Sequence, residues 1–87
     1  MGTANAAVGW VEHTDYACDY FVVDGMLGYA VLEWWGGAWP IEGQRVVGRF
    51  ESYGFKTVRV GRRSMRVWVE DYWLDRDEAY ESMYSNC

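Results

Sequence analysis

The chain has 87 residues, enough for one small domain spanning its whole length. Hydrophobic residues make up 51 % and aromatic residues 18 %, which excludes an intrinsically disordered chain. The formal net charge of −5, from 8 Lys and Arg against 13 Asp and Glu, excludes a wholly basic, histone-like binder of nucleic acid. Large side chains enlarge a small core, so we expect Trp and Tyr to supply much of it and some of them to stay exposed.

Short runs of β-branched and aromatic residues between glycines predict six antiparallel strands. We expect the N-terminal residues 1–7 to be flexible. The predicted strands are Val8–His13, Tyr20–Asp24, Tyr29–Trp35, Gln44–Phe50, Phe55–Val60 and Met65–Glu70. Connections of about four residues between several of these strands are typical of β-hairpins.

The last part of the chain changes to helical spacing. Asp75, followed three residues later by Glu78, matches the capping-box pattern of a helix start. Tyr80, Met83 and Tyr84 then recur at the spacing of one helix face, which predicts a short helix that follows Asp75 and ends at about Tyr84. A helix this short is not stable alone, so we expect these three side chains to contact the sheet.

A short antiparallel meander leaves edge strands exposed unless it closes on itself. We therefore predict a mainly β fold: a small six-stranded barrel or strongly curved sheet, SH3-like or OB-like, with one short C-terminal helix. Gly48 and Gly54 suit the sharp bends of such a barrel. The alternative is a flat sheet with the helix across one face.

The two cysteines, Cys18 and Cys87, form no CxxC pair, and His13 has no second histidine at metal-ligand spacing. The sequence therefore predicts no metal and no cofactor. Disulfide scaffolds of this size normally use more cysteines, so we expect two free thiols, with a Cys18–Cys87 disulfide as the alternative. No secretory signal or apolar run of membrane length is present, which predicts a cytoplasmic protein with no membrane partner.

Charges are segregated along the chain. Residues 1–44 carry six acidic residues and no Lys or Arg, and residues 67–87 carry six acidic residues against Arg76. Residues 45–66, in contrast, carry seven basic residues against Glu51. This basic segment coincides with the last three predicted strands.

In the last two predicted strands, apolar and polar residues alternate, so we expect valines to face the core and arginines to face outward. With residues 61–64 as the turn, Arg59 lies opposite Arg66. If the fourth and fifth strands pair, arginines of the fourth strand extend the same outer surface. The candidate binding residues on this surface are Arg45, Arg49, Arg59, Arg66 and Trp68.

Two arginines opposite each other repel, so an acidic group is expected to compensate them. One interpretation is internal: Glu33, Glu12 or the acidic helix forms a salt-bridge network with the hairpin. The other interpretation is external: the arginines face an acidic protein surface or a nucleic acid.

Adjacent tryptophans form the second unusual feature. Trp34 and Trp35 must point to opposite faces of a strand, so one belongs to the core and the other lies outside. Trp39 follows in a glycine-rich loop. Either Trp39 plugs one barrel end and the outer Trp covers an apolar corner, or Trp35 and Trp39 anchor a protein-binding surface, where Trp, Tyr and Arg are enriched. Tyr72 and Trp73 carry the same two interpretations.

No catalytic motif is present. His13 and Asp15 are a candidate acid–base pair, but no recognisable nucleophile accompanies them, and an enzyme centred there would need a concave pocket. We therefore predict a non-enzymatic protein-interaction module, an inhibitor or an accessory factor, that binds a protein partner or itself through the Arg/Trp-rich β face. The alternatives are single-stranded nucleic-acid binding with Trp68 stacked on bases, which the net charge disfavours, and an acidic mimic of nucleic acid.

Overall fold

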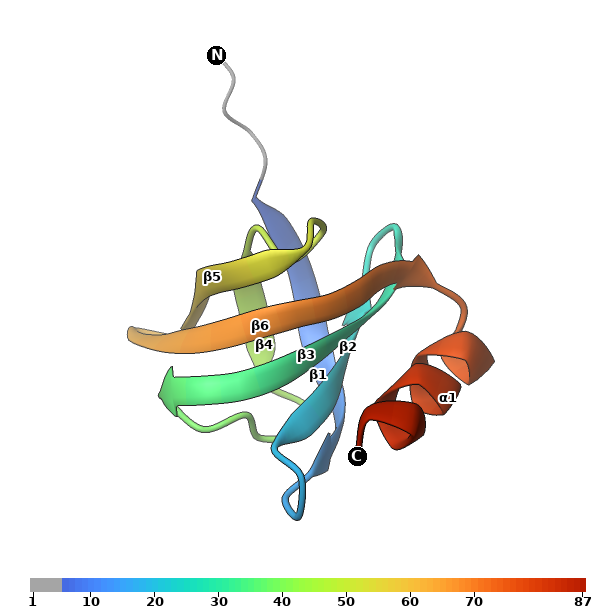
Figure 1. Ribbon diagram of the computed structural model, residues 1–87. Coiled ribbons are helices and arrows are strands. Elements are labelled where there is room, and N and C mark those ends of the chain that lie inside the picture. The colour runs from blue at the N-terminus through green and yellow to red at the C-terminus, as the bar shows by residue number, and fades with distance from the viewer. Residues whose placement is uncertain (1–5) are drawn as a thin grey trace.

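The computed structural model describes residues 6–87 and contains a closed antiparallel barrel followed by one helix (Figure 1). The elements are β1 (Ala7–Asp15), β2 (Tyr20–Gly25), β3 (Gly28–Gly37), β4 (Arg45–Gly48), β5 (Gly54–Val60), β6 (Arg63–Leu74) and α1 (Arg76–Asn86). Around the barrel the strands follow the order β1-β2-β3-β6-β5-β4, and β4 pairs with β1 to close it. The predicted barrel is confirmed, and the flat-sheet alternative is wrong.

The predicted flexible N-terminus is partly wrong, because Ala7 already belongs to β1 and packs against the core. Residues 1–5, the rest of that prediction, lie outside the described residues. In the part of the chain that the structure describes, no helix has the length and apolar character needed to cross a membrane.

The barrel interior is filled by apolar side chains from all six strands and the loops between them. Side chains alternate along a strand, so roughly every second residue points inward. The buried interior consists of Val11, Phe21, Val23, Ala30, Leu32, Ala38, Val46, Phe50, Val58, Val60, Met65, Val67 and Val69. The predicted inward orientation of the valines in β5 and β6 is therefore confirmed.

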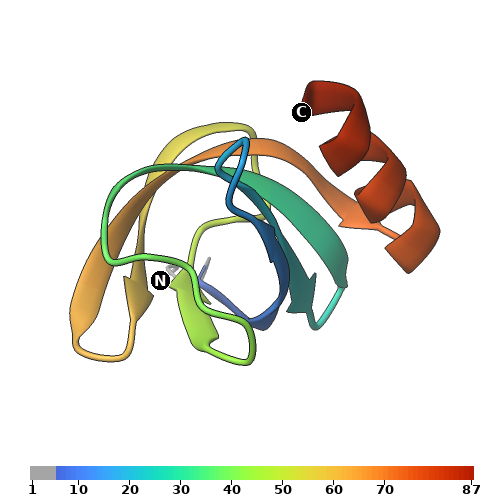
Figure 2. The same cartoon turned by 90° about the horizontal axis from the view of Figure 1, so that it is seen from below.

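A second apolar core lies outside the barrel wall, between α1 and the strands β2 and β3 (Figure 2). Ala79 and Met83 of α1 are fully buried against Val22 and Val31. Because β2 and β3 are covered on both sides here, their sequences are continuously apolar over residues 21–23 and 30–32. Of the predicted helix contacts, Met83 and Tyr80 are confirmed, whereas Tyr84 is exposed.

The start of α1 is the predicted capping box. The Asp75 carboxylate accepts a hydrogen bond from the Glu78 backbone N–H at 2.8 Å, and the Glu78 carboxylate accepts one from the Asp75 backbone N–H at 2.9 Å. These two bonds satisfy backbone donors that a helix start otherwise leaves unpaired. They fix the point at which the chain leaves β6 and turns back over β2 and β3.

The turn between β5 and β6 is two residues long, where four were expected. Gly61 adopts φ +66°, a left-handed conformation that glycine accepts without strain and that tight hairpins require. As a result Arg59 lies opposite Ser64 and Arg66 lies opposite Thr57, so the predicted Arg59–Arg66 pair is wrong. The register differs by two residues, and a shift of two leaves every side chain on its predicted face.

Candidate interaction surface

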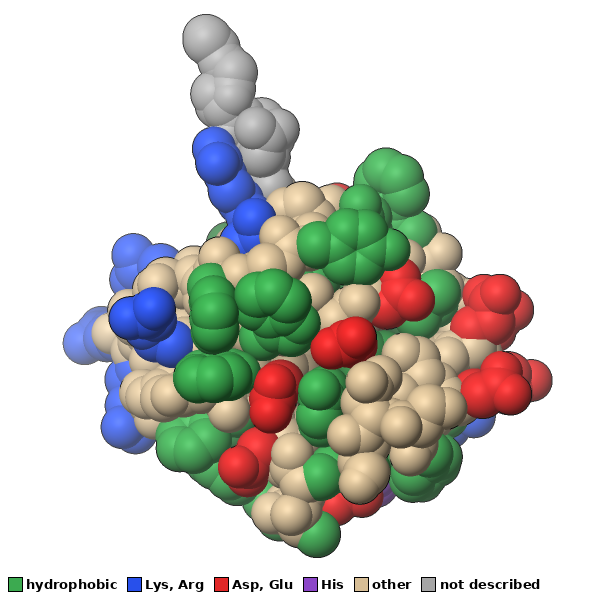
Figure 3. Space-filling view, viewed as in Figure 1, with side chains coloured by type: hydrophobic (Ala, Val, Ile, Leu, Met, Phe, Trp, Pro, Cys, Tyr) green, Lys and Arg blue, Asp and Glu red, His purple; other side chains and the backbone are tan. Residues whose placement is uncertain are grey.

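The outer surface of β3, β6 and β5 carries a group of aromatic side chains that we call the aromatic face: Trp35, Phe55 and Trp68. The Phe55 ring meets Trp35 and Trp68 edge to face, with centroid distances of 4.9 and 4.8 Å. Trp68 is half-buried, whereas Trp35 and Phe55 are 57 % and 52 % exposed. Figure 3 shows apolar side chains gathered at the centre of this side of the barrel.

A second aromatic group lies where β5 begins and β6 ends. Tyr53 and Tyr72 have ring centroids 4.8 Å apart, and Tyr72 meets Trp73 at 5.2 Å. The Tyr53 hydroxyl donates a hydrogen bond to the Asp71 carboxylate at 3.3 Å. Trp73 has φ +59°, which is rare for a bulky residue and marks a local break in the strand. The pairing of β6 with β3 shifts register between Asp71 and Leu74, and β6 ends at Leu74, four residues beyond its predicted end at Glu70.

Charged residues of opposite sign flank the aromatic face along β6. The outward positions of this strand are Arg66, Trp68 and Glu70 in turn, and Glu33 of β3 lies opposite Trp68. The Glu33 carboxylate accepts a hydrogen bond from the Trp35 indole N–H at 3.0 Å. The face therefore has a basic end, an aromatic centre and an acidic end, and Figure 3 shows basic side chains gathered on one side of the apolar group and acidic ones on the other.

Tyr20 shows how closely the acidic residues gather at that end. Its side chain is buried, and burial together with the nearby carboxylates of Glu33 and Glu70 raises the pKa of Tyr20 to about 12. The phenol therefore stays neutral at physiological pH. Tyr20 lies under α1, so the acidic end of the aromatic face borders the surface that the helix covers.

Ion pairing leaves the basic segment unneutralised. Across residues 6–87 two pairs of oppositely chargeable groups lie within ion-pair distance: Arg76–Glu12, with 2.6 Å between Nε and Oε2, and His13–Glu42, with 3.3 Å between Nδ1 and Oε2, which is ionic only when the imidazole is protonated. None of the basic residues of segment 45–66 takes part in either pair. The predicted internal network is therefore wrong, because Glu12 binds Arg76 and Glu33 accepts from Trp35.

Arg45 and Arg59 meet on the outside of β4 and β5, where they line a shallow hollow together with Val47 and Gly61. Val47 lies directly opposite Arg59, so the fourth and fifth strands do pair, which the sequence had left as a condition. Arg49 is exposed just beyond the end of β4. The predicted binding arginines thus line more than one side of the barrel wall, and Arg66 is the one directly next to Trp68 on the outer face of β6.

The tryptophan pair behaves as predicted, but Trp39 does not join the aromatic face. Trp34 packs against the barrel core and its indole N–H donates to the Ala38 carbonyl at 2.9 Å. Trp39 is half-buried between Trp34, at a centroid distance of 4.3 Å, and the stacked ring of Tyr16 at 5.5 Å. These contacts favour the packing interpretation for Trp39.

The proposed acid–base pair is wrong. His13 is paired with Glu42, while the Asp15 carboxylate accepts a hydrogen bond from the Ala17 backbone N–H at 3.0 Å. Glu42 also accepts from the Thr14 backbone N–H at 3.2 Å. His13 and Glu42 therefore tie the loop before β4 to strand β1.

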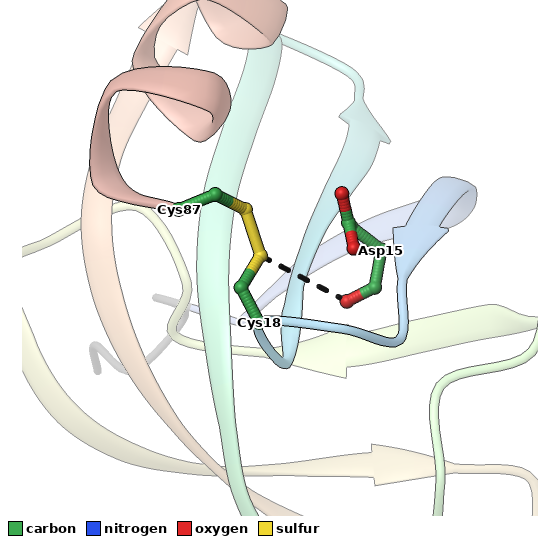
Figure 4. Close-up of side chains that lie close together, drawn as sticks. All are labelled: Asp15, Cys18 and Cys87. Carbon is green, nitrogen blue, oxygen red and sulfur yellow. Dashed lines mark hydrogen bonds between the residues drawn. A yellow bond between two sulfur atoms is a disulfide. The ribbon is translucent and has the colours of Figure 1, made fainter.

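The cysteines form a disulfide that joins the β1–β2 turn to the last residue (Figure 4). The Cys18 and Cys87 Cα atoms are 5.4 Å apart, a usual distance for a disulfide. The expected free thiols are therefore wrong and the alternative is confirmed. Asp15 lies beside both sulfur atoms, but thiolates are the sulfur species that bind metals and a disulfide offers none. The cytoplasmic location stays a prediction, and it no longer has free thiols in its favour.

Phe55 is the central ring of the aromatic face, and sequence reasoning did not single it out. A usable signal was present, because Phe55 stands on the same face of the predicted strand 55–60 as Thr57 and Arg59, which were assigned outward. An aromatic residue at an outward position of a predicted strand indicates a candidate binding residue.

No family model matches the chain, and neither a curated protein nor a solved structure matches it.

Proposed function

We propose that the chain is a non-enzymatic protein-interaction module that binds a protein partner through the aromatic face. The observation that carries this proposal is the exposure of Trp35 and Phe55 on the outer wall of the barrel, next to Arg66. Exposed apolar patches rimmed by charged residues mark interaction sites, and Trp and Arg are the residue types that dominate binding energy at protein interfaces. Each buried aromatic ring removes roughly 150–250 Å² from water.

The rings are held in place before any partner arrives. Trp35 is fixed by its hydrogen bond to Glu33, and Phe55 is wedged between two tryptophans. The strands beneath them belong to a closed barrel with a filled interior. Binding therefore orders few side chains, and less of the binding energy is spent on lost conformational entropy.

A protein fits this surface better than a nucleic acid does. Single-stranded nucleic acid would stack bases on Trp68, but its phosphates would then approach Glu33 and Glu70. A protein partner can present acidic groups to one end and basic groups to the other. The presence of both signs beside the same rings supports a protein partner.

Site-specific photo-cross-linking tests this proposal in cells in which the chain is native. A benzoylphenylalanine at position 55 reports on the aromatic face, and the same group at position 84, an equally exposed position on α1, is the matched control. We expect a discrete protein adduct from position 55 only, which excess unlabelled chain competes away and which Trp35→Ser weakens. Equal labelling from both positions, or none from position 55, would refute the proposal.

A further inference from the structure

We infer that the partner of the aromatic face is a second copy of this chain, bound in antiparallel orientation about a twofold axis through Trp68. This inference rests on the proposed function and names its partner. It is carried by the order of outward side chains along β6: Arg66, Trp68 and Glu70.

A twofold contact buries the same patch on both copies, so the patch has to be complementary to itself. A face with charges of one sign fails this condition. Here the axis through Trp68 exchanges position 66 with position 70, so Arg66 of each copy lies against Glu70 of the other. The two positions are equally far from Trp68, at roughly 7 Å each for two residues of extended chain.

Arg66 is exposed, and Glu70 is half-buried beside Tyr20. Neither Arg66 nor Glu70 takes part in the ion pairs that the structure forms within residues 6–87. In the antiparallel arrangement Phe55, which pairs with Trp68, lies at the axis, and Trp35, next to Gly36, lies beside Arg66. A parallel arrangement would place Arg66 against Arg66, and like charges at such a contact are repulsive.

The closed barrel removes the other common route to self-association. Strands at the edge of an open sheet pair with strands of another copy, but here every strand has two neighbours within the same chain. Association therefore has to occur between side-chain surfaces. The aromatic face offers both large rings and charges of both signs for such a contact.

Charge exchange across the predicted axis provides a sharp test by sedimentation equilibrium. In an Arg66→Glu homodimer, the introduced carboxylate would face Glu70 of the other copy, and in a Glu70→Arg homodimer two guanidinium groups would face each other. We expect each single variant to dimerise at least about tenfold more weakly than the unmodified chain. An equimolar mixture of the two variants should recover the dimer, because each variant then faces its opposite. The double variant Arg66→Glu/Glu70→Arg should also dimerise.

The matched controls are Arg49→Glu and Asp77→Arg, which reverse exposed charges outside the aromatic face and should leave dimerisation unchanged. A monomeric unmodified chain at millimolar concentration overturns the inference, as does a dimer that ignores the exchanges at positions 66 and 70. The cross-link from position 55 separates the two proposals. An adduct of twice the chain's mass supports both the proposed function and the second copy as partner. An adduct of another mass supports the proposed function but overturns the second copy as partner. The absence of any adduct refutes both proposals.

Discussion

Two apolar outer surfaces of the barrel meet on β3, and the chain covers only one of them. Near the start of β3, Val31 is completely buried beneath Met83 of α1. Near its end, Trp35 is more than half exposed beside Phe55. Helix α1, fixed by its capping box and by the disulfide, covers the surface around Val31. Within residues 6–87 no helix or strand covers the surface around Trp35. An apolar outer surface of this barrel is buried where a helix packs on it, and the aromatic face stays exposed without one.

The two surfaces should differ most in how much their side chains contribute to the free energy of unfolding. Met83→Ala truncates a side chain of α1 that is fully buried between the helix and the barrel. It should lower the free energy of unfolding by about 2–5 kcal/mol. Phe55→Ala removes a larger but half-exposed ring and should cost less than about 1 kcal/mol in the monomer. Urea denaturation at low protein concentration measures both. Equal losses would show that the aromatic face is a structural core.

The disulfide should matter almost as much, since it holds the end of the covering helix. Cys18 and Cys87 are separated by 69 residues, and closing so long a loop restricts the unfolded chain. Cys18→Ser/Cys87→Ser should therefore lower the free energy of unfolding by about 2–4 kcal/mol. A reducing agent should reproduce this loss in the unmodified chain and have no effect on the double variant. If reduction leaves the unfolding midpoint unchanged, α1 is held by its packing alone.

Alkaline titration probes the border between the two surfaces. The pKa of Tyr20 is raised from 10.0 to about 12, mainly by burial and then by Glu33 and Glu70, so the folded chain keeps a proton that the unfolded chain loses. The stability from this group is complete below pH 10 and is lost as the pH rises toward about 12. The unmodified chain should therefore lose stability more steeply than Tyr20→Phe over this interval. Parallel curves would show that Tyr20 is not buried beside those carboxylates.

The smallest expected effect concerns nucleic acid. We expect single-stranded oligonucleotides to leave the tryptophan fluorescence unchanged at low salt, because Glu33 and Glu70 repel phosphates from the rings. Quenching that weakens steeply with added salt, and that Trp68→Ala removes, would favour the nucleic-acid alternative. Arg59→Glu should then weaken it as well, since Arg59 lines the hollow with Arg45.

The sequence predicts correctly the features that depend only on the alternation of side chains along a strand. It does not predict those that depend on the conformation of a turn or on which strands are neighbours. Val58 and Arg59 were assigned to the correct faces because a register error of two residues preserves alternation. The register itself depends on Gly61 adopting a left-handed conformation, which its sequence permits but does not impose. Consequently the predicted Arg59–Arg66 repulsion disappears in the structure.

The candidate site shows the same division. Trp68 was predicted because it stands at an outward position in a strand, and Trp34 and Trp35 were predicted to face opposite sides of theirs. Trp39, in contrast, lies in a loop, whose side-chain directions follow no period. The prediction of an internal ion-pair network was wrong because the partner of each acidic side chain depends on which elements are neighbours in the fold. Glu12 of β1 lies next to the start of α1, where Arg76 binds it. The disulfide can form because the end of α1 lies beside the β1–β2 turn. The positions of two cysteines in the sequence do not show that these segments are close in the fold.

The most direct test of the central claim, that the aromatic face is a binding surface, is the cross-link from position 55 in the purified chain. We expect an adduct of twice the chain's mass, which Arg66→Glu suppresses and which returns when the Arg66→Glu and Glu70→Arg variants are mixed. If position 55 yields no adduct in the purified chain or in native cells, the aromatic face is not a binding surface.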